Sequence, residues 1–223
     1  IYHREPGVTL AAQKSLAEQS GNRFLLGIGV SHKPLVEGVR GLEYRPPVAT
    51  MRSYLEKMQG SPYTGRMPEA ETPTVIAALG PKMLALAAEQ ASGAHPYFTS
   101  PEHTRMAREV MGEGPLLCVE QKVICEENPE KARATARPVA KIYHMLPNYR
   151  NNWLRMGLTD SDIDDLSDRF IDATFAWGSM DQIRNRIQAH HDAGADHVCI
   201  QPIHPEMGMA VLDWDCLEAL SPN

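Results

Sequence analysis

The chain has 223 residues and a net charge of −6, with acidic and basic residues mixed along its length. This charge balance argues against a nucleic-acid or membrane-surface partner, and no apolar run approaches the roughly 20 residues that a membrane span needs. The four cysteines lie in apolar settings without a Cys-x-x-Cys pair. We therefore expect reduced thiols in a cytoplasmic protein and no metal site.

The first six residues have the pattern of a strand end followed by a loop, and a helix is expected over residues 7–19. Ile1 is not an initiator methionine, and the sequence begins as the middle of a domain does. We therefore expect a fragment or a processed chain in which earlier strands of the same sheet are missing.

A buried strand is expected over residues 24–30, Phe-Leu-Leu-Gly-Ile-Gly-Val. Gly27 and Gly29 share one face of such a strand, because side chains alternate across it. Glycines on an inner face let a ligand or another backbone approach closely, and a bend at a barrel corner explains them equally well. Residues 31–73 are punctuated by glycine and proline around one predicted helix, 48–58, and form an excursion of the kind that often builds sites.

The next strand, residues 74–79, passes into a helix at 81–90 through Gly80 alone. Ser100 and Asn128 precede similar proline-initiated helices and can cap them with a side-chain oxygen, whereas Gly80 cannot. Lys82 also has the wrong sign for the positive end of a helix dipole. A bound anion such as a phosphate would remove both anomalies. The alternative is that Gly80 only permits a tight turn and that Lys82 is solvated.

Strands and helices alternate along the rest of the chain, which predicts parallel pairing with right-handed crossovers. We count about five complete strands, too few for a closed eight-stranded barrel unless three more lie upstream. His190 and His191, late in one helix, are expected to favour the negative end of its dipole rather than to bind a metal. The further predicted elements are strands at 94–98, 116–125 and 197–203, and helices at 102–111, 130–146, 161–173, 179–193 (opened by a Ser-x-x-Gln capping box) and 209–220.

Four segments together resemble the luciferase-like monooxygenase superfamily: residues 20–29, residues 77–93, Trp177-Gly178-Ser179 and residues 193–198. The continuation at 30–34, Val-Ser-His-Lys-Pro, is most similar to the branch that uses the deazaflavin coenzyme F420. The resemblance implies an α/β fold, a TIM (β/α)8 barrel of the luciferase-like type that is N-terminally incomplete. It also implies a single domain over residues 1–223, commonly in a homodimer.

The resemblance further implies where a cofactor binds and what it does. The strand end would lie beside the deazaflavin or isoalloxazine ring, and the turn at Gly80 would hold the cofactor phosphate. The implied chemistry is hydride transfer between coenzyme F420 and a small organic substrate. The alternatives are an FMN-dependent monooxygenase and a non-catalytic flavin-binding protein. The implied cofactor-binding residues are Gly27, Gly29, Val30, Ser31, Leu79, Gly80, Pro81, Lys82 and Met83.

The catalytic candidate is His32, which follows the glycine strand at its carboxyl end, where barrel enzymes carry their catalytic groups. It could donate a proton or bind cofactor hydroxyls, or it could equally be a loop histidine that caps backbone groups. Candidates for substrate contacts are His3 at the mouth, Trp177, and His204 just past the last strand. Zinc-ligand spacing, a Gly-x-Ser-x-Gly elbow and a Walker loop are all missing from the sequence.

Overall fold

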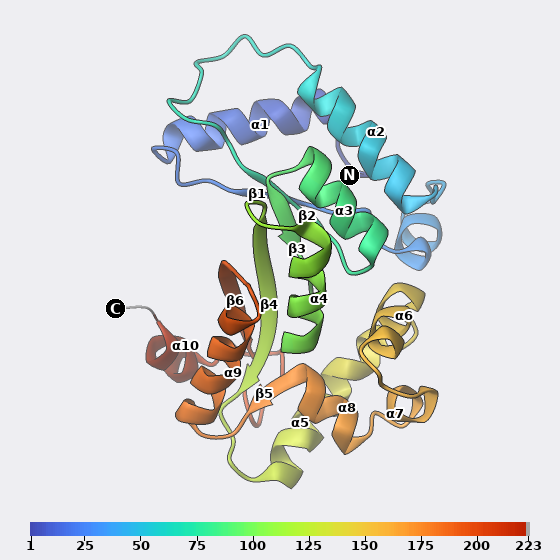
Figure 1. The fold of residues 1–223 in the computed structure, drawn as a ribbon, viewed down its shortest axis with the longest axis vertical. Coiled ribbons are helices and arrows are strands. Elements are labelled where there is room, and N and C mark those ends of the chain that lie inside the picture. Colours follow the sequence, from blue (N-terminus) through green and yellow to red (C-terminus); the bar gives the residue numbers. More distant parts are fainter. Residues whose placement is uncertain (222–223) are drawn as a thin grey trace. The chain divides into compact units, whose positions relative to one another are not determined.

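The computed structural model describes residues 1–221, and the chain divides into two compact units whose elements Figure 1 labels. Unit 1 comprises residues 1–95 and 110–116. Unit 2 comprises residues 96–109 and the chain from 117 onward. Each unit contains its own set of parallel strands with helices packed on them. The interpretation of the chain as one barrel domain stays a prediction.

Unit 1 contains three parallel strands in the order in which they occur in the chain. They are β1 (Leu26–Ile28), β2 (Thr74–Ala77) and β3 (Gly93–His95). In the register, Gly27 lies opposite Val75, and Val75 lies opposite Gly93. The helices of this unit are α1 (Pro6–Gln19), the π-helix η1 (Pro34–Val39), α2 (Pro47–Gln59) and α3 (Pro81–Gln90).

One hydrophobic cluster joins α1 and α2 to β1. Leu10, Tyr54 and Met58 are buried together, and Leu26 and Ile28 pack against them from the strand. Burial of such side chains contributes about 1.5–3 kcal/mol each. Because Leu26 and Ile28 face the helices, Gly27 between them faces the opposite side of the sheet.

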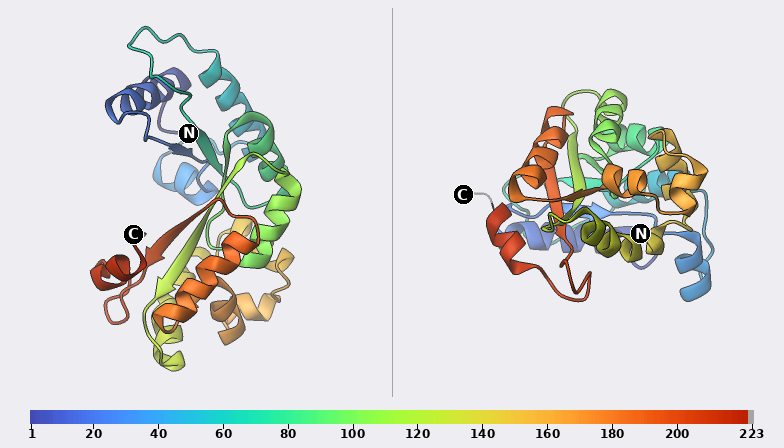
Figure 2. Two further views of the ribbon diagram at one scale, coloured as in Figure 1. Left: turned by 60° about the vertical axis from the view of Figure 1, so that its left-hand side comes forward. Right: turned by 90° about the horizontal axis from the view of Figure 1, so that it is seen from below.

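Unit 2 is built around β4 (Leu116–Ile124), which pairs in parallel with both β5 (Phe175–Trp177) and β6 (His197–Pro202). Helix α9 lies against β5 and β6, as Figures 1 and 2 show. The helices assigned to this part of the chain are α4 (Pro101–Met111), α5 (Pro129–Tyr143), α6 (Pro147–Arg155), α7 (Asp160–Asp164), α8 (Asp168–Thr174), α9 (Met180–Asp192) and α10 (Trp214–Leu220).

Aromatic side chains form the core on one side of β4. Trp153 is fully buried, and its ring meets Phe98 and Phe170 edge to face at centroid distances of 5.1 and 4.8 Å. Its Nε1 donates a hydrogen bond of 3.1 Å to the carbonyl of Phe98. A second cluster, with Val123 and Ala176, packs against α9 and α10. The chain therefore buries both faces of β4.

The predicted strands and parallel pairing are confirmed, and the structure corrects five elements. The segment at 31–73 contains the π-helix η1 in addition to the predicted helix, α2. A sixth strand, β5, lies between α8 and the Ser179 capping box, where only three extended residues mark it. The predicted helix at 130–146 ends at Tyr143, and Pro147 starts α6. Leu146 is extended, the conformation preferred by a residue that precedes a proline, and proline suits the first helical position. The helical stretch at 161–173 is two helices, and the last helix starts at Trp214 after an Asp213 cap. Within residues 1–221, none of the helices is long and apolar enough to cross a membrane.

His190 differs from its sequence-based interpretation, because it is buried rather than available as a charge at the helix end. Its Nε2 lies 2.9 Å from Oε1 of Gln121, whose amide nitrogen already donates to two carbonyls. Nε2 of His190 must therefore carry the proton, and Nδ1 accepts from the Thr104 hydroxyl at 2.8 Å. Burial, with a contribution from the Arg186 charge, lowers the pKa of His190 to about 4.

This pKa makes folding sensitive to acid. In the unfolded chain His190 binds a proton below about pH 6.5, whereas in the folded protein it stays neutral down to about pH 4. Between these two pH values the free energy of unfolding therefore falls as the pH falls. We expect the wild type to lose about 3 kcal/mol relative to His190→Gln as the pH falls from 7 to 4. Urea unfolding at several pH values measures this difference. As a control, His197→Gln replaces an exposed histidine and should show the same dependence of unfolding free energy on pH as the wild type. If His190→Gln also showed the wild-type pH dependence, the assignment of this dependence to His190 would be wrong.

Candidate functional site

The turn that is predicted to bind an anion joins β2 to α3 in unit 1. Gly80 is the N-cap of α3 with an extended backbone (φ −90°, ψ 158°), and no side chain caps the helix. Its carbonyl accepts hydrogen bonds from the N–H groups of Met83 and Leu84 at 3.1 and 3.0 Å. Pro81 and Lys82 are exposed, whereas Met83 is buried. The predicted absence of a cap is confirmed, and the Lys82 side chain lies on the exposed first turn.

The other two proline-initiated helices of the comparison are capped as predicted. Asn128 Oδ1 accepts from the N–H of Lys131 at 3.1 Å, and Ser100 Oγ accepts from the N–H of His103 at 3.4 Å. However, α2 and α6 also begin without a side-chain cap. The missing cap alone therefore does not distinguish α3. What distinguishes α3 is its position directly after β2, the strand that pairs with the glycine-containing strand β1.

The backbone of Gly80 bears on the alternative that glycine only permits a tight turn. Its φ and ψ lie in the extended region that every L-residue adopts easily. The turn therefore does not need glycine for its conformation. Glycine instead leaves the start of α3 without a side chain in front of it. A phosphate that binds at a helix N-terminus needs this space.

The two glycines of the β1 segment serve different purposes. A Cβ on Gly29 would lie 3.1 Å from the Cβ of Ala77, so Gly29 allows the two chains to pack closely. A Cβ on Gly27 would meet nothing within 4 Å. Gly27 therefore leaves space on the sheet face turned away from α1 and α2. Both glycines therefore allow a close approach, but of different groups. The space at Gly27 is open to a ligand, whereas the space at Gly29 is taken by the neighbouring strand.

Strand pairing brings these two segments together. Ile28 pairs with Ile76, so residues 29–31 and residues 77–80 leave the sheet at the same edge. Leu79 and Gly80 are half-buried there, as are Val30 and Ser31. The carboxyl edge of a parallel sheet is where ligands bind in folds of this class.

Ser31 and His32 turn the chain away from the sheet. Ser31 has a positive φ of 57°, a strained conformation for a residue other than glycine, and such strain is concentrated at functional sites. Arg40 donates to its Oγ at 3.3 Å. The carbonyl of His32 accepts from the N–H groups of Leu35 and Val36, at the start of η1. The backbone of His32 thus has the capping role that we weighed against catalysis, and a role for its half-buried imidazole stays a prediction.

The remaining predicted residues are His3, Trp177 and His204. The N-terminal ammonium group of Ile1 donates to the carbonyl of Gly29 at 2.9 Å, so the chain begins beside the glycine strand. His3 is exposed in the bend before α1 in unit 1. Trp177 and His204 belong to unit 2.

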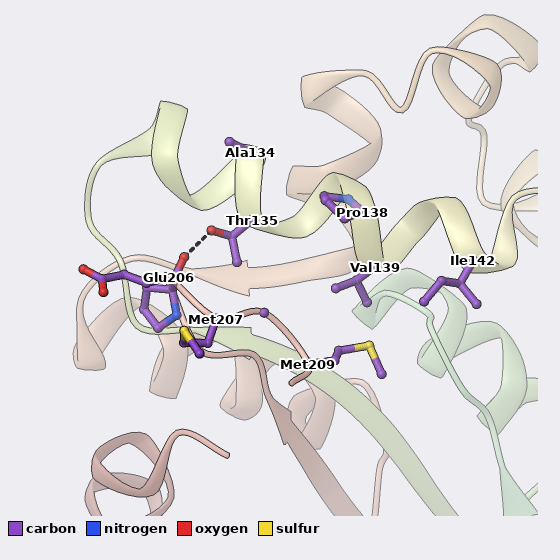
Figure 3. A pocket seen from close by; sticks show the side chains of 10 residues that line it. Ala134, Thr135, Pro138, Val139, Ile142, Glu206, Met207 and Met209 are labelled. Atoms are coloured by element: carbon purple, nitrogen blue, oxygen red, sulfur yellow. Dashed lines mark hydrogen bonds between the residues drawn. The ribbon is translucent and has the colours of Figure 1, made fainter. Parts of the chain in front are cut away.

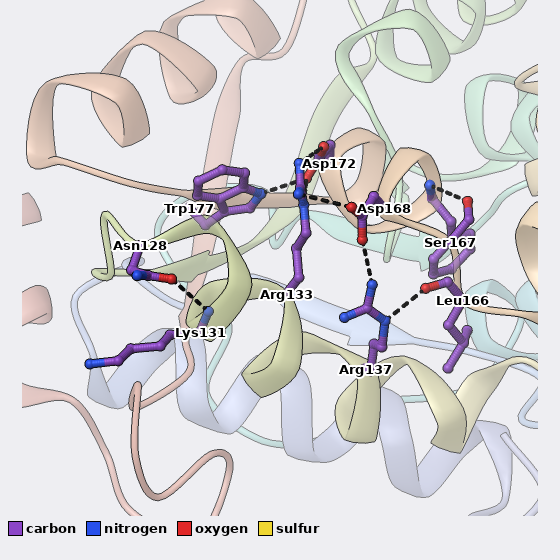
Figure 4. Close-up of polar contacts among 10 residues, drawn as sticks. Asn128, Lys131, Arg133, Arg137, Leu166, Ser167, Asp168, Asp172 and Trp177 are labelled. Atoms are coloured by element: carbon purple, nitrogen blue, oxygen red, sulfur yellow. Dashed lines mark hydrogen bonds and ion pairs between the residues drawn. The ribbon is translucent and has the colours of Figure 1, made fainter.

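Trp177 ends β5 within a network of ion pairs (Figure 4). Its Nε1 donates to Asp172 Oδ1 at 2.9 Å, and the Arg133 guanidinium lies 5.3 Å from the indole centroid. Arg133 also pairs with Asp172 and Asp168. The protein itself therefore engages the indole N–H and a face of the ring, which is a structural role. A substrate contact of Trp177 stays a prediction.

His204 begins a tight turn just past β6. Its Nδ1 accepts from the N–H groups of Glu206 and Met207, both at 3.2 Å. This turn borders a hollow of about 510 Å³ against α5, which Figure 3 shows, and Thr135 of α5 donates to the carbonyl of Pro205 at 2.6 Å. The lining is mostly apolar, and a substrate contact of His204 stays a prediction. The residues that line the hollow are Ala134, Thr135, Pro138, Val139, Ile142 and Pro205 to Met209.

A buried ion pair on β4 is the feature that sequence reasoning missed. Lys122 is fully buried and Glu120 is 3% exposed, and Nζ lies 3.1 and 3.2 Å from the two carboxylate oxygens. Nζ also lies 3.7 Å from the ring centroid of Tyr97 and 4.0 Å from that of Phe98. Desolvation lowers the pKa of Lys122 to about 8, although the Glu120 charge opposes the shift.

The ion pair holds the segment that follows β3. The N–H of Phe98 donates to Glu120 Oε2 at 2.9 Å, and Phe98 has a positive φ of 60°. The Tyr97 hydroxyl donates to Gln201 Oε1 at 2.8 Å and lies 2.9 Å from the Tyr143 hydroxyl. Because Tyr97 has one proton to donate, the proton between the two tyrosines belongs to Tyr143.

This cluster has the chemistry of a proton-transfer site. It combines a lysine whose pKa lies near neutrality with a chain of hydroxyls, close to the carboxyl ends of β4 and β6, where Lys122 pairs with Gln201. The signal in the sequence was the presence of two charges, Glu120 and Lys122, on either side of Gln121 in a strand whose other residues are apolar. At a spacing of two they had to share one face, and burial then required that they pair.

Comparison with known proteins assigns the family. A sequence model described as luciferase-like monooxygenase matches residues 1–197, so the chain belongs to this family. The chain is 24% identical to a Mycobacterium tuberculosis protein named as a coenzyme F420-dependent oxidoreductase, over 86% of this chain and 73% of the relative. It is 30% identical to 5,10-methylenetetrahydromethanopterin reductase of Archaeoglobus fulgidus over 129 residues, which cover 51% of this chain and 39% of the reductase.

Among solved structures, an F420-dependent secondary alcohol dehydrogenase in complex with an F420-acetone adduct is similar with a TM-score of 0.68. The two sequences are 14% identical, and the match covers 99% of this chain and 76% of the dehydrogenase. The predicted α/β fold of the luciferase-like barrel type is thereby confirmed.

The buried pair makes a specific prediction for stability. Lys122→Met leaves the Glu120 carboxylate buried without its partner, which should cost about 3–5 kcal/mol. The double variant Glu120→Gln/Lys122→Met removes both charges and should cost clearly less, because replacing a whole buried pair is often close to neutral. Urea unfolding followed by tryptophan fluorescence compares the three proteins. Equal losses in the single and double variants would show that Lys122 matters through packing alone.

Proposed function

We propose that this protein is an oxidoreductase that transfers a hydride between the deazaflavin coenzyme F420 and a small organic substrate. The observation that carries the proposal is the turn at Gly80, where a helix begins without a side-chain cap at the carboxyl end of β2. The relatives whose names include F420 support this choice of cofactor. The homodimer and the cytoplasmic location stay predictions.

The residues of unit 1 fit the parts of such a cofactor. The first turn of α3 offers backbone N–H groups and the exposed Lys82 to a phosphate. Gly27 leaves space on the neighbouring strand, where a flat ring could lie against the sheet. When bound, F420 supplies the hydride, and the chain's task is to bind and orient it.

Unit 2 by itself offers polar groups of the kind that act at a developing charge. Tyr97, Tyr143 and Gln201 in unit 2 form a connected hydrogen-bond chain near the carboxyl ends of β4 and β6. Hydroxyls held in this way can stabilise an oxygen atom on which negative charge forms. The assignment of Trp177, His3 and His204 to substrate contacts belongs to the same proposal.

Direct binding tests the cofactor assignment. Oxidised F420 and FMN are titrated separately into the full-length protein and followed by fluorescence and calorimetry. We expect saturable binding of F420 that is tighter than that of FMN. Preferential FMN binding would favour a monooxygenase, and binding of neither would remove the cofactor from the proposal. Tight F420 binding without turnover on any hydride acceptor would favour a non-catalytic protein.

A substitution at Gly80 separates cofactor binding from helix stability. Gly80→Asp supplies α3 with an N-cap and an acidic group at its positive end, so stability should stay the same or rise by a few tenths of a kcal/mol. The same carboxylate occupies and repels the phosphate position, so F420 affinity should fall at least tenfold, which corresponds to about 1.4 kcal/mol.

The matched control is Asn128→Asp, which places the same charge at the N-cap of α5 and keeps that helix capped. Its F420 affinity should equal that of the wild type. Unchanged affinity in Gly80→Asp would show that the phosphate binds elsewhere, even if F420 binds.

A further inference from the structure

Two cysteines that are far apart in the sequence meet in unit 2. The Sγ atoms of Cys125, just past β4, and Cys216, in the first turn of α10, lie 2.6 Å apart across 91 positions of sequence. Cys216 is buried in the cluster with Val123 and Ala176, and Cys125 packs against it while staying half-exposed. All four cysteines are free thiols, as expected, but Cys199 is exposed rather than in an apolar setting.

The pair could in principle hold a metal ion with Asp213, since the three ligand atoms lie within 4.8 Å of one another. Two thiolates on one tetrahedral zinc lie about 3.8 Å apart, given bonds of about 2.3 Å. The observed sulfur separation is much shorter. The Asp213 carboxylate is also already used as the cap of α10, where it accepts from the N–H of Cys216 at 3.0 Å. The contact therefore suits a sulfur–sulfur bond better than a shared ion.

We propose that Cys125 and Cys216 form a reversible intramolecular disulfide, with Cys125 as the thiol that meets the oxidant and Cys216 as the resolving thiol. Cys125 is the more exposed of the two. The S–H of Cys125 donates to the Cys216 sulfur, and this hydrogen bond lowers the pKa of Cys216. The same hydrogen bond, together with burial, raises the pKa of Cys125. Cys125 must therefore lose its proton to solvent before it attacks, and the exchange should become faster as the pH rises.

The chemistry is thiol–disulfide exchange with a low-molecular-weight disulfide. The Cys125 thiolate attacks one sulfur of the oxidant, forms a mixed disulfide and releases one thiolate. The Cys216 thiolate then attacks the Cys125 sulfur, which breaks the mixed disulfide and releases the second thiolate. Two protein thiols are oxidised, the oxidant is reduced to two thiols, and the two protons that leave the cysteines are taken up by the released thiolates.

The bond would tie α10 to the carboxyl end of β4. A cross-link between residues 91 positions apart closes a long loop, which restricts the unfolded chain strongly. The contact already exists in the reduced fold, so the bond requires little movement of either element. Oxidation should therefore raise the melting temperature by several degrees rather than disrupt the structure.

The experiment uses the native full-length protein and oxidised glutathione as the probe. The protein is equilibrated with glutathione buffers of increasing oxidising strength, free thiols are blocked with N-ethylmaleimide in denaturant, and intact mass and peptide mapping are recorded. We expect two fewer blocked thiols, a cross-linked peptide pair that contains Cys125 and Cys216, and a raised melting temperature that dithiothreitol reverses.

Matched variants identify the cysteines. Cys199→Ser should keep both the cross-link and the temperature shift, whereas Cys125→Ser and Cys216→Ser should lose both. Cys125→Ser should form no mixed disulfide at Cys216, and Cys216→Ser should retain glutathione on Cys125. Four blockable thiols under every buffer, a cross-link that uses Cys118 or Cys199, or one that forms only in denaturant would each overturn the proposal. Equimolar zinc that protects both cysteines in the native protein would overturn it as well.

Discussion

Parallel strand pairing is the constraint on which the functional geometry of this chain depends. In unit 1 the pairing of Ile28 with Ile76 brings residues 29–31 and 77–80 to one edge of the sheet. In unit 2 the pairing of Lys122 with Gln201 places polar groups near the carboxyl ends of β4 and β6. Parallel strands need helical crossovers, so every strand end is followed by a loop or a helix start. Those segments carry the candidate chemistry in both units.

Unit 2 shows how a buried charge is tolerated next to such an edge. Glu120 and Lys122 satisfy each other, and Glu120 also accepts from the N–H of the strained Phe98. An unpaired ion at either position would be far more costly than the pair. The same contacts orient Tyr97, because its ring lies against the lysine and its hydroxyl reaches Gln201. One electrostatic pair thereby sets the conformation of the segment after β3.

Local signals predicted much of the site in unit 1. Alternation across a strand predicted that Gly27 and Gly29 share one face. In the structure Leu26 and Ile28 pack against α1 and α2, so Gly27 faces the other side of the sheet. The missing cap of α3 was visible as Gly80-Pro81, since capping depends on residues within one turn. Local sequence signals did not predict features that depend on packing between several elements. The contacts of the Trp177 indole with Asp172 and Arg133, for example, had no signal in the sequence. The strand β5 is too short for its periodicity to be recognised.

The sequence by itself determined the order of strands and helices, their parallel pairing, the family and the position of the uncapped turn. These features follow from periodicity, from capping residues and from motifs, all of which act over short stretches of chain. Only the tertiary structure decided which distant side chains meet: Lys122 with Tyr97, His190 with Gln121 and Thr104, and Cys125 with Cys216. Their contacts depend on the register of β4 and on the packing of α9 and α10 against it. Strand register and helix packing are set by the total apolar surface that whole faces of the sheet bury. A short sequence pattern does not contain this information.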